Sequence, residues 1–218
     1  MKKKIILGIL LAVFATFASY AQDGIAPFVT EDGYHIWDVP WADWNNGEVV
    51  AYAWVEILGY TGTSRAISIP SNLNGWLVGG PVTVIRKEAF FDKQLTSVTI
   101  PSSVKVIGQG AFHTNLLTAI TIPNSVTEIG IGAFMNNRLT SITIGSGVTS
   151  IGEVTFYENP ITSITIGAGV NIHENAFFGH HEDGIGYRNN FVEFYNAQGR
   201  LAGTYTRPNA RSTTWTRR

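Results

Sequence analysis

Cysteine is absent from the chain, and charged residues are scarce. None of the 218 residues is cysteine, which excludes disulfides, thiolate catalysis, cysteine-ligated metals and lipid attachment to an N-terminal cysteine. Only 14% of the residues are charged and the formal net charge is −1, so we expect no nucleic-acid partner, because such proteins usually carry a basic excess. Beyond the N-terminus, the sequence also lacks an apolar run long enough to cross a bilayer.

The first 21 residues have the three parts of a signal peptide. Lysines at positions 2–4 precede an apolar stretch over residues 5–17, and Ser19-Tyr20-Ala21 forms a small-x-small cleavage site. The apolar stretch is short for a membrane span, so an uncleaved anchor is the lesser alternative. We therefore expect residues 1–21 to be removed and the mature chain to have no transmembrane segment. The protein is then exported to the periplasm, the cell surface or the extracellular medium.

A unit of 22 residues recurs along the chain. Leucine or isoleucine opens its successive copies, at Leu95, Leu117, Leu139 and Ile161. Phenylalanine closes them, at Phe90, Phe112, Phe134, Phe156 and, after a one-residue deletion, Phe177. A fixed period of this length is typical of solenoids, in which each rung buries its apolar face only by stacking on its neighbours. The spacing predicts a mainly β solenoid of about five rungs, with a spine of stacked phenylalanines.

Within a rung, apolar and polar residues alternate as in a strand with one buried face. Val98 and Ile100 alternate with Ser97 and Thr99, and Pro101 then ends the strand. The outward positions form a stripe of serine and threonine with no aromatic ring or charge, which is a poor surface for tight protein binding.

Glycine and asparagine recur at fixed places in the rung. Glycine follows an isoleucine at 108, 130 and 152, where we expect the positive φ that glycine adopts readily; Arg86 and His173 hold this place in the outer rungs. Asparagine recurs every 22 residues, at Asn115, Asn137 and Asn159. This recurrence predicts a ladder of side-chain amides, which form hydrogen bonds with backbone groups in the turns between rungs.

The rung pattern resembles the BspA-like leucine-rich repeats of the treponemal type. The resemblance rests on Leu-x-x-Val/Ile-x-Ile-Pro, then Ser-Val-x-x-Ile-Gly, then Ala-Phe, over residues 66–178, and more loosely on 59–62 and 191–206. Asparagine stands in the turn after Ala-Phe, where many relatives have cysteine. The resemblance implies a non-enzymatic secreted or surface protein, and several relatives resemble adhesins for fibronectin and fibrinogen. It carries over no binding residue and no cofactor.

We expect caps at both ends, because the outer rungs of a solenoid expose strand edges and core. Residues 22–65 form the expected N-terminal cap, residues 66–182 the repeat solenoid, and residues 183–218 a C-terminal cap with a basic tail. Trp37, Trp41 and Trp44 have the spacing of one helix face, and they either plug the core or form an aromatic platform for a ligand. In the C-terminal cap, residues 191–195 and 201–206 predict a β-hairpin.

No catalytic set of residues emerges from the sequence. The face that varies most from rung to rung carries His113, Arg138 and Tyr157, which together with the three tryptophans are our candidate ligand-binding residues. The only local cluster with metal-ligand character is His173 with His180, His181 and Glu182, and nothing in the sequence forces these groups to converge, so we expect a solvated loop, no metal and no cofactor.

Three hypotheses for function follow. The leading one is a non-enzymatic secreted or surface protein that binds a protein ligand such as host extracellular matrix. The second is a periplasmic or secreted carrier of a small hydrophobic ligand near the aromatic cap. The third is a self-associating structural protein, because residues 22–64 carry seven acidic residues and no Lys or Arg, whereas residues 184–218 carry six arginines and one glutamate.

Overall fold

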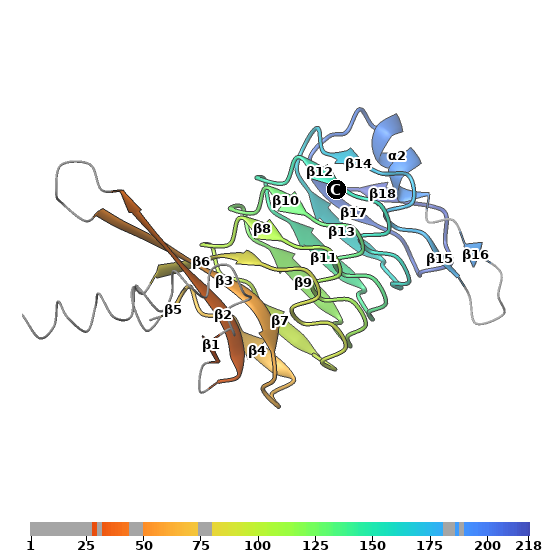
Figure 1. Cartoon of the computed structure of the whole chain (residues 1–218). Helices are drawn as coiled ribbons and strands as arrows, with labels where there is room; N and C mark the ends of the chain where they lie inside the picture. The colour runs from red at the N-terminus through yellow and green to blue at the C-terminus, as the bar shows by residue number, and fades with distance from the viewer. Residues whose placement is uncertain (1–27, 30–31, 44–49, 74–79, 181–185, 188–189) are drawn as a thin grey trace, which may run out of the picture.

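The chain forms a β-solenoid. The computed structural model describes residues 28–29, 32–43, 50–73, 80–180, 186–187 and 190–218. Within these residues the chain winds through about four turns of about 22 residues, and Figure 1 shows the rungs side by side. The five phenylalanines of the repeat mark the rungs, and the intervals between them are these turns. The predicted mainly β solenoid is confirmed.

Each turn contributes two short strands to two ladders. The first ladder consists of β4 (Ala66–Ser68), β7 (Ser97–Thr99), β9 (Ala119–Ile122), β11 (Ser141–Ile144) and β13 (Ser163–Ile166). The second consists of β6 (Gly80–Ile85), β8 (Val106–Ile107), β10 (Glu128–Ile129), β12 (Ser150–Ile151) and β14 (Asn171–Ile172). Neighbouring strands pair in parallel or lie side by side, with equivalent residues aligned, as Ile142 is with Ile120 and Ile164.

The core is a column of aromatic and aliphatic side chains inside the two ladders. The inward isoleucines of the strands are buried, and the repeat phenylalanines form the predicted spine. Their rings stack at centroid distances of 5.0, 5.3, 5.5 and 5.2 Å, with interplanar angles of 11° or less, in the order Phe90, Phe112, Phe134, Phe156 and Phe177. Because identical rings meet at every rung, the repeat builds one continuous core.

The N-terminal cap is made of strands. β1 (Phe28–Val29), β2 (Tyr34–Asp43) and β3 (Val50–Tyr60) are antiparallel, β3 pairs with β6 in parallel, and β5 (Asn72–Leu73) adds to β6. The predicted helix through Trp37 and Trp41 is therefore wrong, because both residues lie in β2. Pro40 fits there because β1 reaches only His35 and Ile36, so beyond them β2 pairs with β3 alone.

The C-terminal cap combines a helix and a hairpin. After the pair β15 (Gly179–His180) and β16 (Gly186–Tyr187), the chain forms α2 (Phe191–Ala197) and then β17 (Gly203–Thr206) and β18 (Thr216–Arg217). β17 pairs antiparallel with β13 and β18, so it closes the end of the first ladder (Figure 1). The predicted hairpin between 191–195 and 201–206 is wrong in its first arm, which is helical; the hairpin joins β17 and β18 instead.

No helix in the described part of the chain has the length and apolar character needed to cross a membrane.

Candidate functional site

The asparagine ladder fixes the turns that carry the candidate residues. The Asn137 amide donates to the carbonyl oxygens of Phe112 and Phe134 at 2.9 and 3.1 Å, and its oxygen accepts from the Leu117 N–H at 3.1 Å. Asn115 and Asn159 make the same bonds one rung away in either direction. All three side chains are buried, so each satisfies backbone groups of two successive rungs, as the sequence predicts.

Two of the three glycines after isoleucine, Gly108 and Gly130, are required for a reason that differs from the expected one. Gly108, Gly130 and Gly152 do not have positive φ. A Cβ on Gly130 would lie 2.4 Å from the Gln109 backbone nitrogen, so this position is kept small by contact with the preceding rung. The left-handed backbone comes two residues later, at Gly110 and Gly132. In the first rung Arg86 takes the glycine place, and its Nε donates to the buried Glu56 carboxylate at 2.6 Å.

The residue after each spine phenylalanine points to the outside of the solenoid. These residues form what we call the turn ladder: Phe91, His113, Met135, Tyr157 and Phe178. Phe91 is 42% exposed and the other four are half-buried. Their rings contact one another, since Phe91 and His113 lie 5.2 Å apart and Tyr157 and Phe178 stack at 6.3 Å. The turn ladder is thus a partly exposed strip of aromatic, imidazole and thioether groups along the solenoid axis.

A strained backbone residue follows most members of the turn ladder. Non-glycine residues adopt φ of +52° to +57° immediately after four of its five members, at Asp92, Thr114, Asn136 and Glu158. Left-handed conformations cost free energy at Thr114 and Glu158 and persist there only where surrounding contacts impose them, whereas Asp92 and Asn136 are residue types that adopt them more readily. The same turn is therefore enforced at each of these rungs, and it places one side chain after another at the same surface position.

The structure brings two of the predicted binding residues into this ladder. His113 and Tyr157 occupy equivalent positions two rungs apart, with Met135 between them. Arg138 is exposed and follows Asn137, so it belongs to the next position of the same turn region. Rung-to-rung variation in the sequence indicates His113 and Tyr157 but not the other three members of the ladder: Met135 lies between them, and Phe91 and Phe178 extend the ladder at its two ends.

Tyr157 has a perturbed phenol. Partial burial raises the pKa of Tyr157, and the neighbouring Glu158 carboxylate, which also forms a hydrogen bond with the phenol, raises the pKa further. The Glu158 N–H donates to the Phe178 carbonyl at 3.1 Å, which holds this carboxylate between the two rungs that carry the stacked rings. The Tyr157 phenol therefore lies beside a carboxyl group on the turn ladder.

Two of the three tryptophan candidates, Trp37 and Trp41, lie in β2. Trp37 and Trp41 occupy register positions opposite Glu56 and Tyr52, and Trp44 lies outside the described residues. The choice between a plug and a ligand platform stays a prediction for them. A plug is nevertheless present, because the buried rings of Tyr34 and Tyr60 contact each other at 5.2 Å, and Tyr60 lies 5.6 Å from Phe90 at the end of the spine.

The metal candidates do not form a site within the described residues. No group of three or more His, Asp or Glu side chains in that part of the chain could hold a metal ion. His173 is exposed and its Nδ1 accepts from the Asn175 N–H at 3.2 Å, whereas His180 lies in β15. His181 and Glu182 lie outside the described residues, so the expected absence of a metal stays a prediction.

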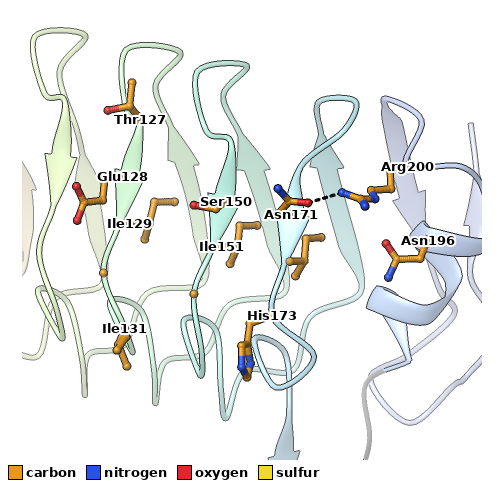
Figure 2. Close-up of a pocket in the computed structure, with 13 residues that line it drawn as sticks. Thr127, Glu128, Ile129, Ile131, Ser150, Ile151, Asn171, His173, Asn196 and Arg200 are labelled. Carbon is orange, nitrogen blue, oxygen red and sulfur yellow. Dashed lines mark hydrogen bonds between the residues drawn. The ribbon is translucent and has the colours of Figure 1, made fainter.

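A hollow with a mixed polar and apolar lining lies over the second ladder, at the end covered by α2. Figure 2 shows its lining residues, which come from β10, β12 and β14 on one side and from Asn196 and Arg200 on the other. Its volume is about 870 Å³. The Arg200 guanidinium donates to the Asn171 side-chain oxygen, and Glu128 and Ser150 line the same surface (Figure 2). The lining also contains the His173 imidazole and four isoleucines, at 129, 131, 151 and 172.

Sequence reasoning did not find this hollow. It exists because α2 packs against the last rung, where the Tyr195 hydroxyl donates to the Gly167 carbonyl at 2.6 Å and accepts from the Val170 N–H at 3.2 Å. The sequence predicts a hairpin here with Asn196 in its turn, and it predicts no functional role for Asn196 or Arg200. The signal that could have found it is the spacing of Phe191, Val192 and Tyr195, which are buried on one face of a helix.

The serine and threonine stripe of the first ladder continues onto the C-terminal cap. β17 pairs with β13 so that Thr206 lies beside Ser163 and Thr204 beside Thr165, with 3.0 Å between the last two hydroxyl oxygens. The stripe is polar and uniform, in contrast to the turn ladder, whose members change from rung to rung. We therefore take the turn ladder as the candidate functional site.

Several solved structures are similar to parts of this chain. The chain is similar to a leucine rich cell surface protein from Faecalibacterium prausnitzii, with 25% identity and a TM-score of 0.46 over 72% of this chain and 52% of that one. It is also similar to a leucine-rich repeat protein from Bacteroides capillosus, with 26% identity and a TM-score of 0.36 over 55% of this chain and 83% of that one. The pneumococcal vaccine antigen PcpA matches at 14% identity and a TM-score of 0.38, over 76% of this chain and 54% of that antigen.

The chain spans only about half the length of the Faecalibacterium protein, 52% of it. No curated protein matches the sequence. The sequence model of the BspA type leucine rich repeat region matches residues 66–195 in 6 copies, which is more than half of the chain. Together with the solenoid, its phenylalanine spine and its asparagine ladder, this match shows that the chain belongs to the BspA-type leucine-rich repeat family.

Proposed function

We propose that this protein is exported and binds a protein ligand through the turn ladder, without catalysis. The signal-peptide pattern of residues 1–21 supports export, and membership of a leucine-rich repeat family supports a role in protein interaction. The observation that carries the proposal is the ladder itself. Its aromatic, methionine and histidine side chains are partly exposed on a rigid scaffold, and such groups supply much of the binding energy in protein interfaces.

The proposed ligand is a host extracellular matrix protein. This part of the proposal comes from the resemblance to BspA-like adhesins, with fibronectin and fibrinogen as the first ligands to test. A rigid solenoid suits this role because its surface is ordered before binding, so little conformational entropy is lost in the complex.

The test measures binding of residues 22–218 to immobilised fibronectin and fibrinogen at low and physiological salt. A triple variant, Phe91→Ser with Tyr157→Ser and Phe178→Ser, removes the exposed rings of the turn ladder. Thr121→Ala with Thr143→Ala on the hydroxyl stripe is the matched control. We expect saturable binding at physiological salt that the ladder variant loses and the control variant keeps.

Two results would contradict the proposal. One is the absence of saturable binding to either matrix protein. The other is equal binding by the heat-unfolded chain, which would reduce the interaction to nonspecific adsorption or charge. Circular dichroism of the ladder variant separates lost binding from lost folding.

A self-associating structural role is the second candidate. It is favoured by the placement of β18 at the outer edge of the five-stranded sheet, because strand edges template pairing with other chains, and Arg217 and Arg218 add positive charge there. Acidic residues 22–64 of another copy would supply the opposite charge. A molecular mass that stays monomeric from low to high salt, measured by light scattering, would dispose of this role.

The carrier hypothesis also stays open as an alternative. Native mass spectrometry of the purified protein tests it, because a carrier would retain a small hydrophobic ligand through purification, and a mass equal to that of the chain alone would count against it.

A further inference from the structure

Charge is unevenly distributed over the rungs of the solenoid. Residues 65–138 contain six basic and three acidic residues. Residues 139–180 contain no Lys or Arg and three acidic residues, namely Glu153, Glu158 and Glu174. The turn ladder crosses both regions, so Phe91 lies at a mixed-charge end and the stacked pair Tyr157 and Phe178 lies at an acidic end. The two ends therefore present different chemistry on the same structural element.

The acidic end combines ring faces with carboxylates. The rings of Tyr157 and Phe178 are nearly parallel, with an interplanar angle of 16°, and Glu158 contacts the phenol of the first ring. Glu153 and Glu174 are exposed and open the turns that lead to these two rings.

Glu153 and Glu174 are also neighbours across the rungs. Ile151 is in register with Ile172, and the Phe156 N–H donates to the Ala176 carbonyl at 2.8 Å, so the two turns run side by side. The two glutamates occupy equivalent places in these turns, one rung apart. Like charges at neighbouring positions repel each other, and a cation bound between them removes that repulsion.

We propose that the acidic end of the turn ladder binds a lysine or arginine side chain of the protein ligand. Cations are attracted to aromatic faces within about 6 Å, and nearby carboxylates strengthen the attraction. Arginine is the better fit because its planar guanidinium stacks on a ring and donates to carboxylates at the same time. This inference rests on the proposed function, since it names the chemistry of the partner segment at that site.

The probe for this inference is a short peptide of alternating arginine and glycine. Its control is the same peptide with citrulline, which keeps the shape of arginine and removes the charge. Binding to the purified protein is measured by fluorescence anisotropy at physiological salt. We expect the arginine peptide to bind at least about fivefold more tightly than the citrulline peptide. Equal affinity for the two peptides would overturn the inference.

Variants locate the peptide on the surface. Tyr157→Ser with Phe178→Ser should weaken binding of the arginine peptide at least about fivefold, and Glu153→Gln with Glu174→Gln should weaken it about threefold or more. Thr121→Ala with Thr143→Ala on the hydroxyl stripe, away from the turn ladder, is the control and should leave the affinity unchanged. If this control weakens binding as much as the acidic-end variants do, or if those variants have no effect, the inference is wrong.

The outcome for the broader proposal is read separately. If the matrix proteins bind and the turn-ladder triple variant abolishes this binding, while arginine and citrulline peptides bind equally, the ladder is an interaction surface without a preference for cations. If the matrix proteins do not bind but the arginine peptide binds at the acidic end, the preference of that end for cations is supported. The proposal that the ligand is a host matrix protein is then wrong.

Discussion

The guanidinium of Arg207 lies over the indole ring of Trp215, 4.9 Å from the ring centroid. Arg207 is only 6% exposed, and its Nε donates to the Ile161 carbonyl at 2.7 Å, while Nη1 donates to the Ser212 carbonyl at 3.1 Å. One buried cation thus ties the last leucine-rich rung, the tail and the terminal hairpin together. The C-terminal tail is rich in arginine, and one of its arginines, Arg207, is buried inside the cap.

Replacing Arg207 should therefore loosen the C-terminal cap. We expect Arg207→Ala to lower the free energy of unfolding by about 2–4 kcal/mol, because buried carbonyls lose their donors and the indole loses its cation. Arg207→Lys should recover only part of this loss, since lysine lacks the planar fork. Urea denaturation followed by tryptophan fluorescence measures both changes, with the exposed Arg211→Ala as the control.

Removing one rung of the asparagine ladder should be costly. Asn137→Ala leaves the buried Leu117 N–H without its side-chain acceptor and removes one of the two amide donors to the Phe112 carbonyl, so we expect a loss of about 2–4 kcal/mol. Asn124→Ala is a close control, because Asn124 also accepts an N–H from the next rung, that of Ser146, but is exposed. That variant should lose less than about 1 kcal/mol. Similar losses for both would show that burial does not decide the role of these amides.

The middle of the phenylalanine spine should be the most sensitive apolar position. Phe134 is fully buried between Phe112 and Phe156, and Phe134→Ala should cost about 3–5 kcal/mol. Thr143→Ala on the hydroxyl stripe should cost well under about 1 kcal/mol. Chemical denaturation of both variants checks the assignment of inward and outward positions, which would be refuted by equal losses.

Two glycines at the same rung position should differ in how strongly replacement by alanine destabilises the fold. Gly130→Ala places a Cβ against the backbone of Gln109 and should destabilise the fold by several kcal/mol, on the order of 2–4. Gly152→Ala meets no atom closer than 3.7 Å and lacks positive φ, so it should change stability by less than about 1 kcal/mol. Thermal unfolding of the two proteins gives the comparison, and an unfolded Gly152→Ala variant would contradict this account of the rung contact.

Stability should fall at high pH because of Tyr34. Burial first, and then the electrostatic effects of Tyr60 and Asp32, raise its pKa from 10.0 to about 12 in the folded protein. The unfolded chain releases this proton at lower pH, so the contribution is complete below pH 10 and is lost as the pH rises from 10 to about 12. Over that window the loss is roughly 2–3 kcal/mol. Tyr34→Phe should reduce this loss of stability, which is measured by denaturation at several pH values. If the variant loses as much stability between pH 10 and about 12 as the original protein does, other groups cause the loss.

The repeat made most of the fold predictable, because the same physical demand recurs at every rung. Leu95, Leu117 and Leu139 are all fully buried, and the period alone places them in one column. The asparagine ladder was also predictable, since amides at a constant interval on stacked rungs can satisfy the groups of their neighbours. The turn glycines show the limit of this reasoning, because the sequence identifies the need for glycine and not whether dihedral angle or space imposes it.

The caps were harder to predict because their residues occur only once. Phe191, Val192, Phe194 and Tyr195 have the composition of a strand, and packing of three of them against the last rung favours a helix instead. Trp37 and Trp41 have helical spacing, but pairing of β2 with β3 over the whole of β2 outweighs it. The turn ladder was found only in part, because Phe91, Met135 and Phe178 differ in type and share only their place in the rung.

The asparagine ladder also allows the array to change its length. Each amide links its own turn to the turn before it, so a duplicated rung would bring its own donor and acceptor and leave the two caps undisturbed. Every added copy would move the ends apart by about 4.8 Å, the spacing of paired strands. Duplication of a segment such as residues 112–133 would thus lengthen the solenoid by one rung. Recombination could in this way change the distance between the surfaces at the two ends in fixed steps.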